Sequence, residues 1–245
     1  MEDPRAPIAR YLREQRESAA LTRVELGAKA GISPALIQKI EQGTRTPTLE
    51  ALTALFDALA VPELFREHLL SLSLSHRYEP TAEAQVRPAD RALIDGMRHP
   101  ASLQRYPTYE ILATNSAWRQ WFPGLAPGIS LLEWMFLDPR AKEVLVEWAP
   151  QVHMCLYGFR VMSPGTAPRK RIADIVARCE AAPEWAAMWA TTPETVHDLD
   201  NQVAVLRDPV TGAVTRMTMH SLSATSRSRR DPTLVAFSPE SASCP

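Results

Sequence analysis

The residues best able to perform catalysis or hold a metal ion are scattered along this chain of 245 residues. The six histidines, at positions 68, 76, 99, 153, 197 and 220, show no spacing typical of metal ligands. His153 and Cys155 are two positions apart, so on a helix they would not face each other as base and nucleophile. No HExxH, GxSxG, P-loop or GxGxxG pattern occurs. We therefore expect no enzymatic activity, no catalytic residues, no metal site and no cofactor.

The cysteines and the chain ends indicate the compartment. Cys155, Cys179 and Cys244 are odd in number and widely spaced, which favours reduced thiols over a disulfide framework or a CxxC motif. No apolar run approaches the roughly 18 residues of a membrane span, and the N-terminus lacks the order of a secretory signal. We expect a cytoplasmic protein with no membrane partner. Arginine supplies 23 of the 27 basic residues, which favours a bacterium with GC-rich DNA.

Aromatic side chains point to a small-molecule site, because all six tryptophans lie between residues 118 and 189. Aromatic and apolar side chains line most small-molecule pockets, although aromatics at helical spacing also form plain core. The predicted pocket residues are Trp118, Trp134, Trp148, Val152 and Trp189, with Met217 and Met219 alternating on a strand beneath them. His153 and Arg160 are either ligands of a carboxylate head group or solvated, structural residues.

Residues 22–47 indicate a second kind of chemistry, contact with DNA. Thr22 and Glu25 form a capping box that begins a helix. Gly31 then permits a tight turn, and Ser33 caps a second helix with Pro34 at its first position. Two short helices joined by such a turn are the geometry that places one helix in the major groove.

The outward face of the second helix would carry the DNA contacts. Its outward residues are predicted to be Ser33, Ala35, Gln38, Lys39 and Gln42. The stretch resembles the XRE or Cro/CI-type helix-turn-helix family, whose pattern T-x-x-E-L-A-x-x-A-G-[IV]-S-x-x-x-I-x-x-[IL]-E-x-G is nearly complete, with Gly27 replacing the usual Ala. The resemblance implies that Pro34, Ala35 and Lys39 face base edges, and that Arg23, Thr44 and Arg45 lie near phosphates. The alternative is a helical packing module that no longer touches DNA.

Overall charge adds little to this prediction. The whole chain has a formal net charge of -1, so it lacks the basic footprint of many nucleic-acid-binding proteins. Residues 1–46 hold eight Lys and Arg against six acids, a local charge of +2. The prediction of DNA binding therefore rests on the motif.

The elements that position these residues fall into two groups. We predict an all-α DNA-binding domain at residues 1–75, a linker at 76–87, and a second domain at 88–245. In the second domain the spacing of apolar residues changes, and the domain begins with a strand hairpin over 101–114. A helix capped by Asn115 follows, with further helices to about residue 190 and strands at 202–207, 214–222 and 233–237. A long helix from Pro139 should kink or split near Ala149, because Pro150 follows. This order predicts an α+β, PAS-like domain whose antiparallel sheet carries helices on one face.

Several stretches of the second domain resemble the ligand-binding domain of MmyB-like transcription regulators. They are Ile111 to Trp118 (ILATNSAW), Leu131 to Ala141 (LLEWMFLDPRA), Val144 to Trp148 and Pro183 to Trp185. The resemblance implies a PAS-like domain that binds a hydrophobic small molecule such as a fatty acid. The basic loop from Thr225 to Asp231 looks particular to this chain, and either contacts DNA backbone or is solvated.

Together these features predict a transcription regulator that binds an inverted-repeat operator in double-stranded DNA as a homodimer. Its second domain would sense a hydrophobic small-molecule effector, a fatty acid or a lipid-like metabolite, and so modulate operator binding. The alternative is a DNA-binding regulator whose second domain is only a dimerisation or protein-interaction platform.

Overall fold

The computed structural model describes residues 5–63, 65–66, 69–70, 85–164, 166–194, 203–222 and 232–240. The chain divides into two compact units, residues 1–80 with 160–166, and residues 81–159 with 167–245. Most of the expected linker at 76–87 and the basic loop from Thr225 to Asp231 lie outside the described residues. Within the described ranges, no helix has the length and apolar character needed to cross a bilayer.

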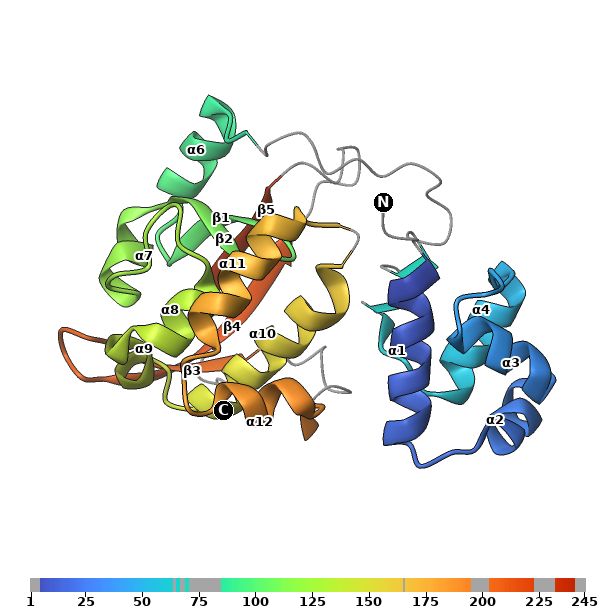
Figure 1. The fold of residues 1–245 in the computed structure, drawn as a ribbon. Helices are drawn as coiled ribbons and strands as arrows, with labels where there is room; N and C mark the ends of the chain where they lie inside the picture. The colour runs from blue at the N-terminus through green and yellow to red at the C-terminus, as the bar shows by residue number, and fades with distance from the viewer. Residues whose placement is uncertain are drawn as a thin grey trace, which may run out of the picture. The chain divides into compact units, whose positions relative to one another are not determined.

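The first unit is a cluster of short helices, α1 (Arg5–Ser18), α2 (Arg23–Ala30), α3 (Pro34–Glu41) and α4 (Leu49–Ala58), drawn in blue in Figure 1. One side of each helix is apolar and buried. The core includes Ile8, Leu12, Leu26, Ile37, Ile40, Leu52, Leu55, Phe56 and Phe65. The expected all-α character of this unit is confirmed.

The turn between α2 and α3 has the predicted caps. Thr22 and Glu25 form the capping box, with the Thr22 amide 2.8 Å from Glu25 Oε2 and the Glu25 amide 3.2 Å from Thr22 Oγ1. Gly31 ends α2 with a φ of 67°, which is favourable for glycine. Ser33 then caps α3 by accepting the Leu36 amide at 3.3 Å. The two helices are therefore separated only by residues 31–33.

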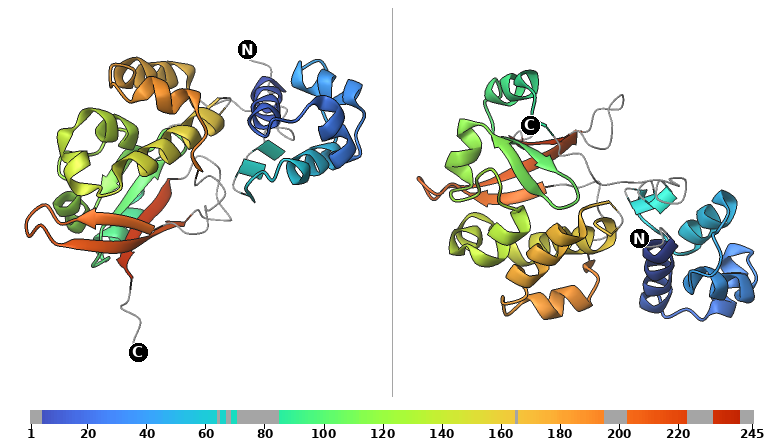
Figure 2. Two further views of the ribbon diagram at one scale, coloured as in Figure 1. Left: turned by 90° about the horizontal axis from the view of Figure 1, so that it is seen from below. Right: turned by 45° about the horizontal axis from the view of Figure 1, so that its top comes forward.

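The second unit is built on one antiparallel sheet of five strands in the order β2-β1-β5-β4-β3. The strands are β1 (Ala101–Arg105), β2 (Glu110–Thr114), β3 (Val203–Arg207), β4 (Val214–Leu222) and β5 (Thr233–Pro239). Figures 1 and 2 show most of the helices of this unit on one face of the sheet. The predicted α+β, PAS-like architecture with an antiparallel sheet is confirmed.

The helices of this unit are α6 (Pro88–Asp95), α7 (Ser116–Trp121), α8 (Leu131–Leu137), α9 (Pro139–Val144), α10 (Trp148–Met162), α11 (Arg169–Cys179) and α12 (Trp185–Ala190). The division into units falls after Phe159, so the last residues of α10 count with the first unit. The main core lies between the sheet and α7 to α12, and contains Trp118, Leu132, Leu156 and Phe237.

Helix α6 packs on the opposite face of the sheet, so the expectation that all helices share one face is wrong. Its Ile94 forms a separate small core with Leu103 and Leu234, which pair across β1 and β5. The next residue of β5, Val235, belongs to the main core on the other face. Helix α6 was not predicted; it begins directly after the expected linker, with Pro88 in a first-turn position of the helix.

Asn115 joins three elements of this unit. Its Nδ2 donates to the carbonyls of Ile94 at 3.1 Å and His99 at 2.9 Å, and its Oδ1 accepts the amides of Ala101 at 3.1 Å and Trp118 at 2.8 Å. The side chain is almost wholly buried. These bonds fix the start of α7 and so place Trp118 in the main core.

The long helix expected from Pro139 is interrupted, but not by Pro150. Leu145 is extended, bridges to Leu206, and is followed by a hydrogen bond of 3.0 Å from the Val146 amide to the Val205 carbonyl. Pairing with β3 therefore ends α9. Pro150 lies in the first turn of α10, where its missing N–H costs no helical bond.

Candidate nucleic-acid interface and ligand pocket

The outward face of α3 is open to solvent along its whole length. Ile37, Ile40 and Glu41 are buried and anchor the helix. The predicted contact residues Ser33, Pro34, Ala35, Gln38, Lys39, Gln42, Thr44 and Arg45 are all exposed. The structure thus brings these eight residues together on α3, its two cap positions and the loop that follows it.

Glu41 fixes α3 to the helices before it. Its side chain is 2% exposed and accepts from Arg16 Nε at 2.6 Å and from Arg23 Nε at 2.8 Å. Arg16 also donates to the Leu21 carbonyl at 3.0 Å. A hydrogen bond from the guanidinium to Glu41 raises the pKa of Arg16, against a smaller opposing effect of burial. This pair of ion pairs holds α1, α2 and α3 in one arrangement.

Arg23 and Arg45 differ in their availability to DNA phosphates. Arg23 is half-buried and engaged with Glu41. Arg45 is exposed and forms no ion pair with the residues that the structure describes. Thr44, the third residue predicted to lie near phosphates, donates its hydroxyl to the Lys39 carbonyl at 3.0 Å. This bond shapes the loop after α3. Of the two arginines, Arg45 is the freer one.

Gly27 stands where the helix-turn-helix pattern usually has alanine, and its surroundings leave no room for a Cβ atom. A Cβ built on Gly27 would lie 2.5 Å from the carbonyl oxygen of Ile32. The Ile32 amide also donates to the Gly27 carbonyl at 3.0 Å. The close approach of these two backbone segments sets the distance between α2 and the start of α3.

Seven of the predicted ligand residues lie in or against the main core of the second unit. Trp118, Trp134, Val152 and Met217 are buried members, and Trp148, Trp189 and Met219 pack against them. Phe122 connects two of these tryptophans, because its ring centroid lies 4.4 Å from that of Trp118 and 6.0 Å from that of Trp134. The structure therefore gathers these residues into one aromatic cluster.

The two predicted head-group residues lie apart from this cluster. His153 Nε2 lies 3.1 Å from the hydroxyl of Thr191. Arg160 is grouped with the first unit, where its Nη2 lies 3.8 Å from Glu14 Oε2. Neither side chain belongs to the main core.

The indole N–H groups of the cluster are not all satisfied. Trp134 donates to the Pro123 carbonyl at 3.0 Å, and Trp148 donates to the Met135 carbonyl at 2.8 Å. Trp118 Nε1 is buried and has no hydrogen-bond partner among the described residues. A buried indole donor normally finds an acceptor, so this position calls for a water molecule or a ligand oxygen.

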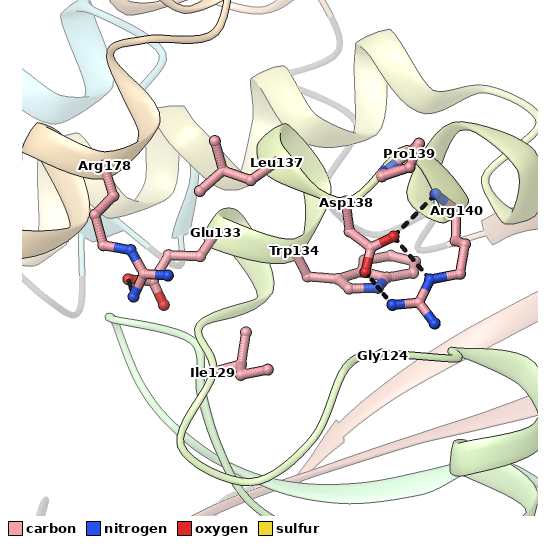
Figure 3. A pocket seen from close by; sticks show the side chains of 9 residues that line it. All are labelled: Gly124, Ile129, Glu133, Trp134, Leu137, Asp138, Pro139, Arg140 and Arg178. Atoms are coloured by element: carbon pink, nitrogen blue, oxygen red, sulfur yellow. Dashed lines mark hydrogen bonds and ion pairs between the residues drawn. The ribbon is translucent and has the colours of Figure 1, made fainter.

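An open pocket of about 420 Å³ lies beside Trp134, between α8 and the loop before it. Figure 3 shows Arg178 at one end, Arg140 at the other, and Ile129, Trp134 and Leu137 between them. The remaining lining residues are Gly124, Glu133, Asp138 and Pro139. Trp134 is the one lining residue that the sequence predicted. Asp138, Pro139 and Arg140 lay in a stretch noted for its family resemblance and, at Pro139, for the start of a helix. No sequence signal marked Arg178.

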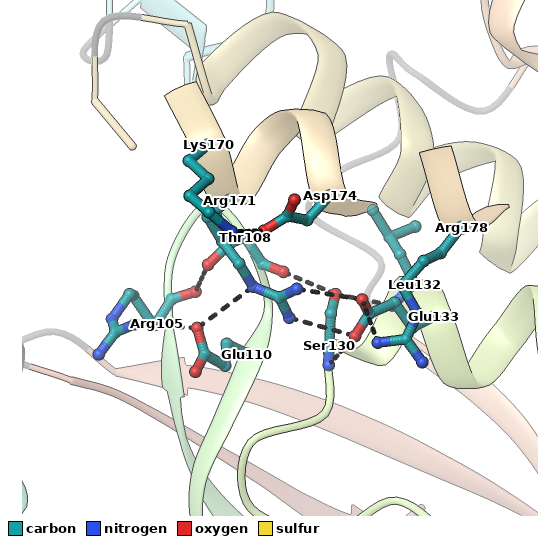
Figure 4. Close-up of polar contacts among 10 residues, drawn as sticks. All are labelled: Arg105, Thr108, Glu110, Ser130, Leu132, Glu133, Lys170, Arg171, Asp174 and Arg178. Carbon is teal, nitrogen blue, oxygen red and sulfur yellow. Dashed lines mark hydrogen bonds and ion pairs between the residues drawn. The ribbon is translucent and has the colours of Figure 1, made fainter. Parts of the chain in front are cut away.

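A network of charges, drawn in Figure 4, underlies the Arg178 end. Glu133, 2% exposed, accepts from Arg171 at 3.0 and 3.1 Å, from Arg178 at 3.2 Å and from the Ser130 amide at 3.0 Å. Burial acts to raise the pKa of Glu133, but the bonds from Arg171 and Ser130 outweigh it, so the pKa is lowered. Glu133 is therefore a structural anion whose bonding capacity is largely used. Among the described residues, no group of three or more His, Cys, Asp and Glu is placed to hold a metal.

An exposed helix held by a buried ion-pair network, followed in the chain by a separate α+β unit, is the arrangement of a two-domain protein with an N-terminal helix-turn-helix. A family described as a helix-turn-helix domain matches residues 7–69, and the MmyB-like transcription regulator ligand binding domain matches residues 86–244. The second match spans most of the chain, so the protein belongs to the family of MmyB-like transcription regulators. This confirms the resemblance noted from the sequence. A search of curated proteins found no match.

Proposed function

We propose that the protein is a sequence-specific DNA-binding regulator whose second unit binds a hydrophobic small molecule and thereby changes operator affinity. The observation that carries the proposal is the exposed face of α3, anchored from behind by Glu41, in a chain whose second unit belongs to a ligand-binding family. A helix held this firmly can present side chains to a groove without further folding.

In the proposed complex, α3 lies in the major groove. Lys39 and Gln38 read base edges, because lysine pairs well with guanine and glutamine with adenine. Pro34 and Ala35 supply only apolar contacts, so DNA shape contributes to specificity. Ser33, Gln42, Thr44 and Arg45 face the flanking backbone, and Arg23 reaches a phosphate only at the expense of its contact with Glu41.

The functional species is proposed to be a homodimer on an inverted repeat. One short recognition helix with few base-reading side chains selects a site poorly, and two such helices spaced by about one turn of DNA select it well. Such dimers bind pseudo-palindromic sites whose symmetry mirrors their own.

The proposed effector is a hydrophobic molecule, such as a fatty acid or a lipid-like metabolite, received by the aromatic cluster around Trp118. The unsatisfied indole of Trp118 supports this, because a polar oxygen of the ligand would complete its bonding. Met217 and Met219 would let the apolar wall adapt to the shape of the ligand. His153 and Arg160 lie outside the aromatic cluster. Contact of either residue with the head group of the ligand therefore requires the chain around it to rearrange on binding.

The test combines selection of DNA sites with native mass spectrometry of the purified full-length protein. We expect enrichment of an inverted repeat from random duplexes, a dimer on that repeat, and a bound apolar molecule released on denaturation. Failure to enrich any sequence would contradict the DNA-binding proposal. Enrichment by a protein that carries no molecule and takes up none from a panel of saturated fatty acids would leave the second unit as a dimerisation or protein-interaction platform.

A further inference from the structure

The pocket beside α8 is a shallow depression, largely open to solvent, whose volume matches that of a small-molecule site. Its volume of about 420 Å³ falls within the range of roughly 300 to 1,000 Å³ common for such sites. Its apolar surface comes from Leu137, which is 43% exposed, and from the half-buried Ile129; Trp134 lies beneath them and is only 2% exposed. An apolar floor with a few charged groups at its edge is the usual composition of a site for an amphipathic molecule.

The Arg178 end carries an excess of positive charge. Arg105, Arg171 and Arg178 face only two carboxylates there, those of Glu110 and Glu133, which leaves one positive charge over. The neighbouring Lys170 and Asp174 pair with each other and cancel. The local balance therefore favours an additional anion.

Arg178 is the cation placed to meet that anion. Its side chain is 63% exposed, and its contact with Glu133 uses one guanidinium nitrogen, Nη1, at 3.2 Å. A guanidinium carries five N–H donors, so most of them remain for another acceptor. Arg171, by contrast, is only 21% exposed and is committed to Glu133 through two bonds.

The opposite end of the pocket is bounded by an ion pair with no net charge. Arg140 donates to Asp138 through Nε at 2.8 Å and Nη2 at 2.5 Å. The pair lies directly over Gly124, whose φ is 87° and where an added Cβ would collide with both side chains. An apolar body lying on Ile129, above Trp134, therefore meets a charged pair after a short distance, which favours a compact molecule over a long chain.

We propose that this pocket binds a compact organic anion, an aromatic carboxylate or sulfonate, with its charged group on Arg178 and its ring on Leu137 and Ile129, above the buried Trp134. The site goes beyond the proposed function, because its charged group and exposed apolar residues lie at the surface of the second unit; it borders the aromatic cluster around Trp118 only through Trp134. Arg178 is its specificity-determining residue, since it provides the charge that distinguishes an anion from a neutral ring.

The experiment is calorimetric titration of the full-length protein with 1-naphthoate and with the neutral analogue 1-naphthalenemethanol. Arg178→Gln should weaken 1-naphthoate binding by about tenfold to a hundredfold, the value of charge-assisted hydrogen bonds, and should leave binding of the neutral analogue unchanged. Lys170→Gln is the matched control: it removes the same unit of charge from the same helix, at a side chain that is 87% exposed and outside the pocket, so it should weaken 1-naphthoate binding much less than Arg178→Gln does.

A second variant, Leu137→Glu, places a carboxylate on the pocket floor at an exposed position and should abolish 1-naphthoate binding. No saturable binding to the wild type, or equal dissociation constants for wild type and Arg178→Gln, would overturn the proposal. Equal weakening by Lys170→Gln would also overturn it, because the effect would then be one of general charge. Dodecanoate binding that depends on Arg178, without naphthoate binding, would overturn the compact ligand class. None of these outcomes alters the selection of an operator, which tests the proposed function separately.

Discussion

The carboxylate of Glu41 accepts two hydrogen bonds from the guanidinium of Arg16, with Nε 2.6 Å from Oε1 and Nη2 3.2 Å from Oε2. The residues lie on α3 and α1, and their side chains are 2% and 9% exposed. Helix α3, the proposed recognition helix, is thus tied to α1 by a buried ion pair. This contact fixes the position of the outward face of α3.

Glu41→Gln should therefore destabilise the first unit. Removing one partner of a buried ion pair leaves an uncompensated charge and typically costs about 3 to 5 kcal/mol. Urea denaturation of the full-length protein measures the loss. Glu17→Gln is the control, since Glu17 also contacts Arg16 but is 58% exposed, and a loss of about 1 kcal/mol or less is expected. Equal small losses in both variants would contradict the account.

Lys39→Ala and Arg45→Ala should weaken DNA binding in different ways. Lys39→Ala should cost about 1 to 3 kcal/mol on the selected operator and little on other sequences, as expected for a base contact. Arg45→Ala should weaken all sequences alike and reduce the slope of log affinity against log salt by about 1. Fluorescence anisotropy at several salt concentrations separates the two. Identical behaviour of both variants would refute these assignments.

Gly27→Ala should lower stability although alanine is the better helix former by up to about 1 kcal/mol. The added Cβ would lie 2.5 Å from a backbone oxygen, that of Ile32, which cannot move without shifting the start of α3. Thermal unfolding measures the change, and Ala28→Gly, at an exposed position of the same helix, gives the propensity effect alone. A more stable Gly27→Ala protein would show that the turn relaxes freely.

Glu133 should make the second unit sensitive to acid. Its pKa is lowered in the folded state, so its contribution to stability is complete above the unfolded value of about 4.3 and is lost as pH falls through the folded pKa. The stability difference between wild type and Glu133→Gln should be constant from pH 7 to about 5 and should shrink below about 4. Glu180→Gln, at an exposed position, is the control. A difference that does not change with pH would rule out the ionised pair as its source.

The parts of the fold that sequence could predict depend on local bonds. Thr22, Ser33 and Asn115 each cap a helix by bonding a backbone amide three residues ahead, and each was predicted as a cap. The break between α9 and α10 could not be assigned correctly, because its cause is the bond from Val146 to Val205, which are 59 positions apart. Pro150 offered a local explanation that the structure does not use.

The candidate sites show the same difference between local features, which the sequence predicts, and long-range contacts, which it does not. Residues of the recognition helix follow from the spacing within one motif, so their exposure was predictable. The lining of the open pocket was not, because Glu133 and Arg178 are 45 positions apart and meet only through the packing of α8 and α11. Similarly, nothing in the sequence indicated that Arg23 would be engaged by Glu41, 18 positions later.

The central claim is that a small molecule in the second unit changes operator affinity. The most direct measurement is the affinity for the selected operator with and without saturating dodecanoate, paired with the affinity for dodecanoate with and without saturating operator. The account predicts a change of about 5- to 150-fold, equal in both directions because coupling between two binding sites is reciprocal. Equal affinities in both pairs, for dodecanoate and for saturated fatty acids of 8 to 16 carbons in turn, would contradict it.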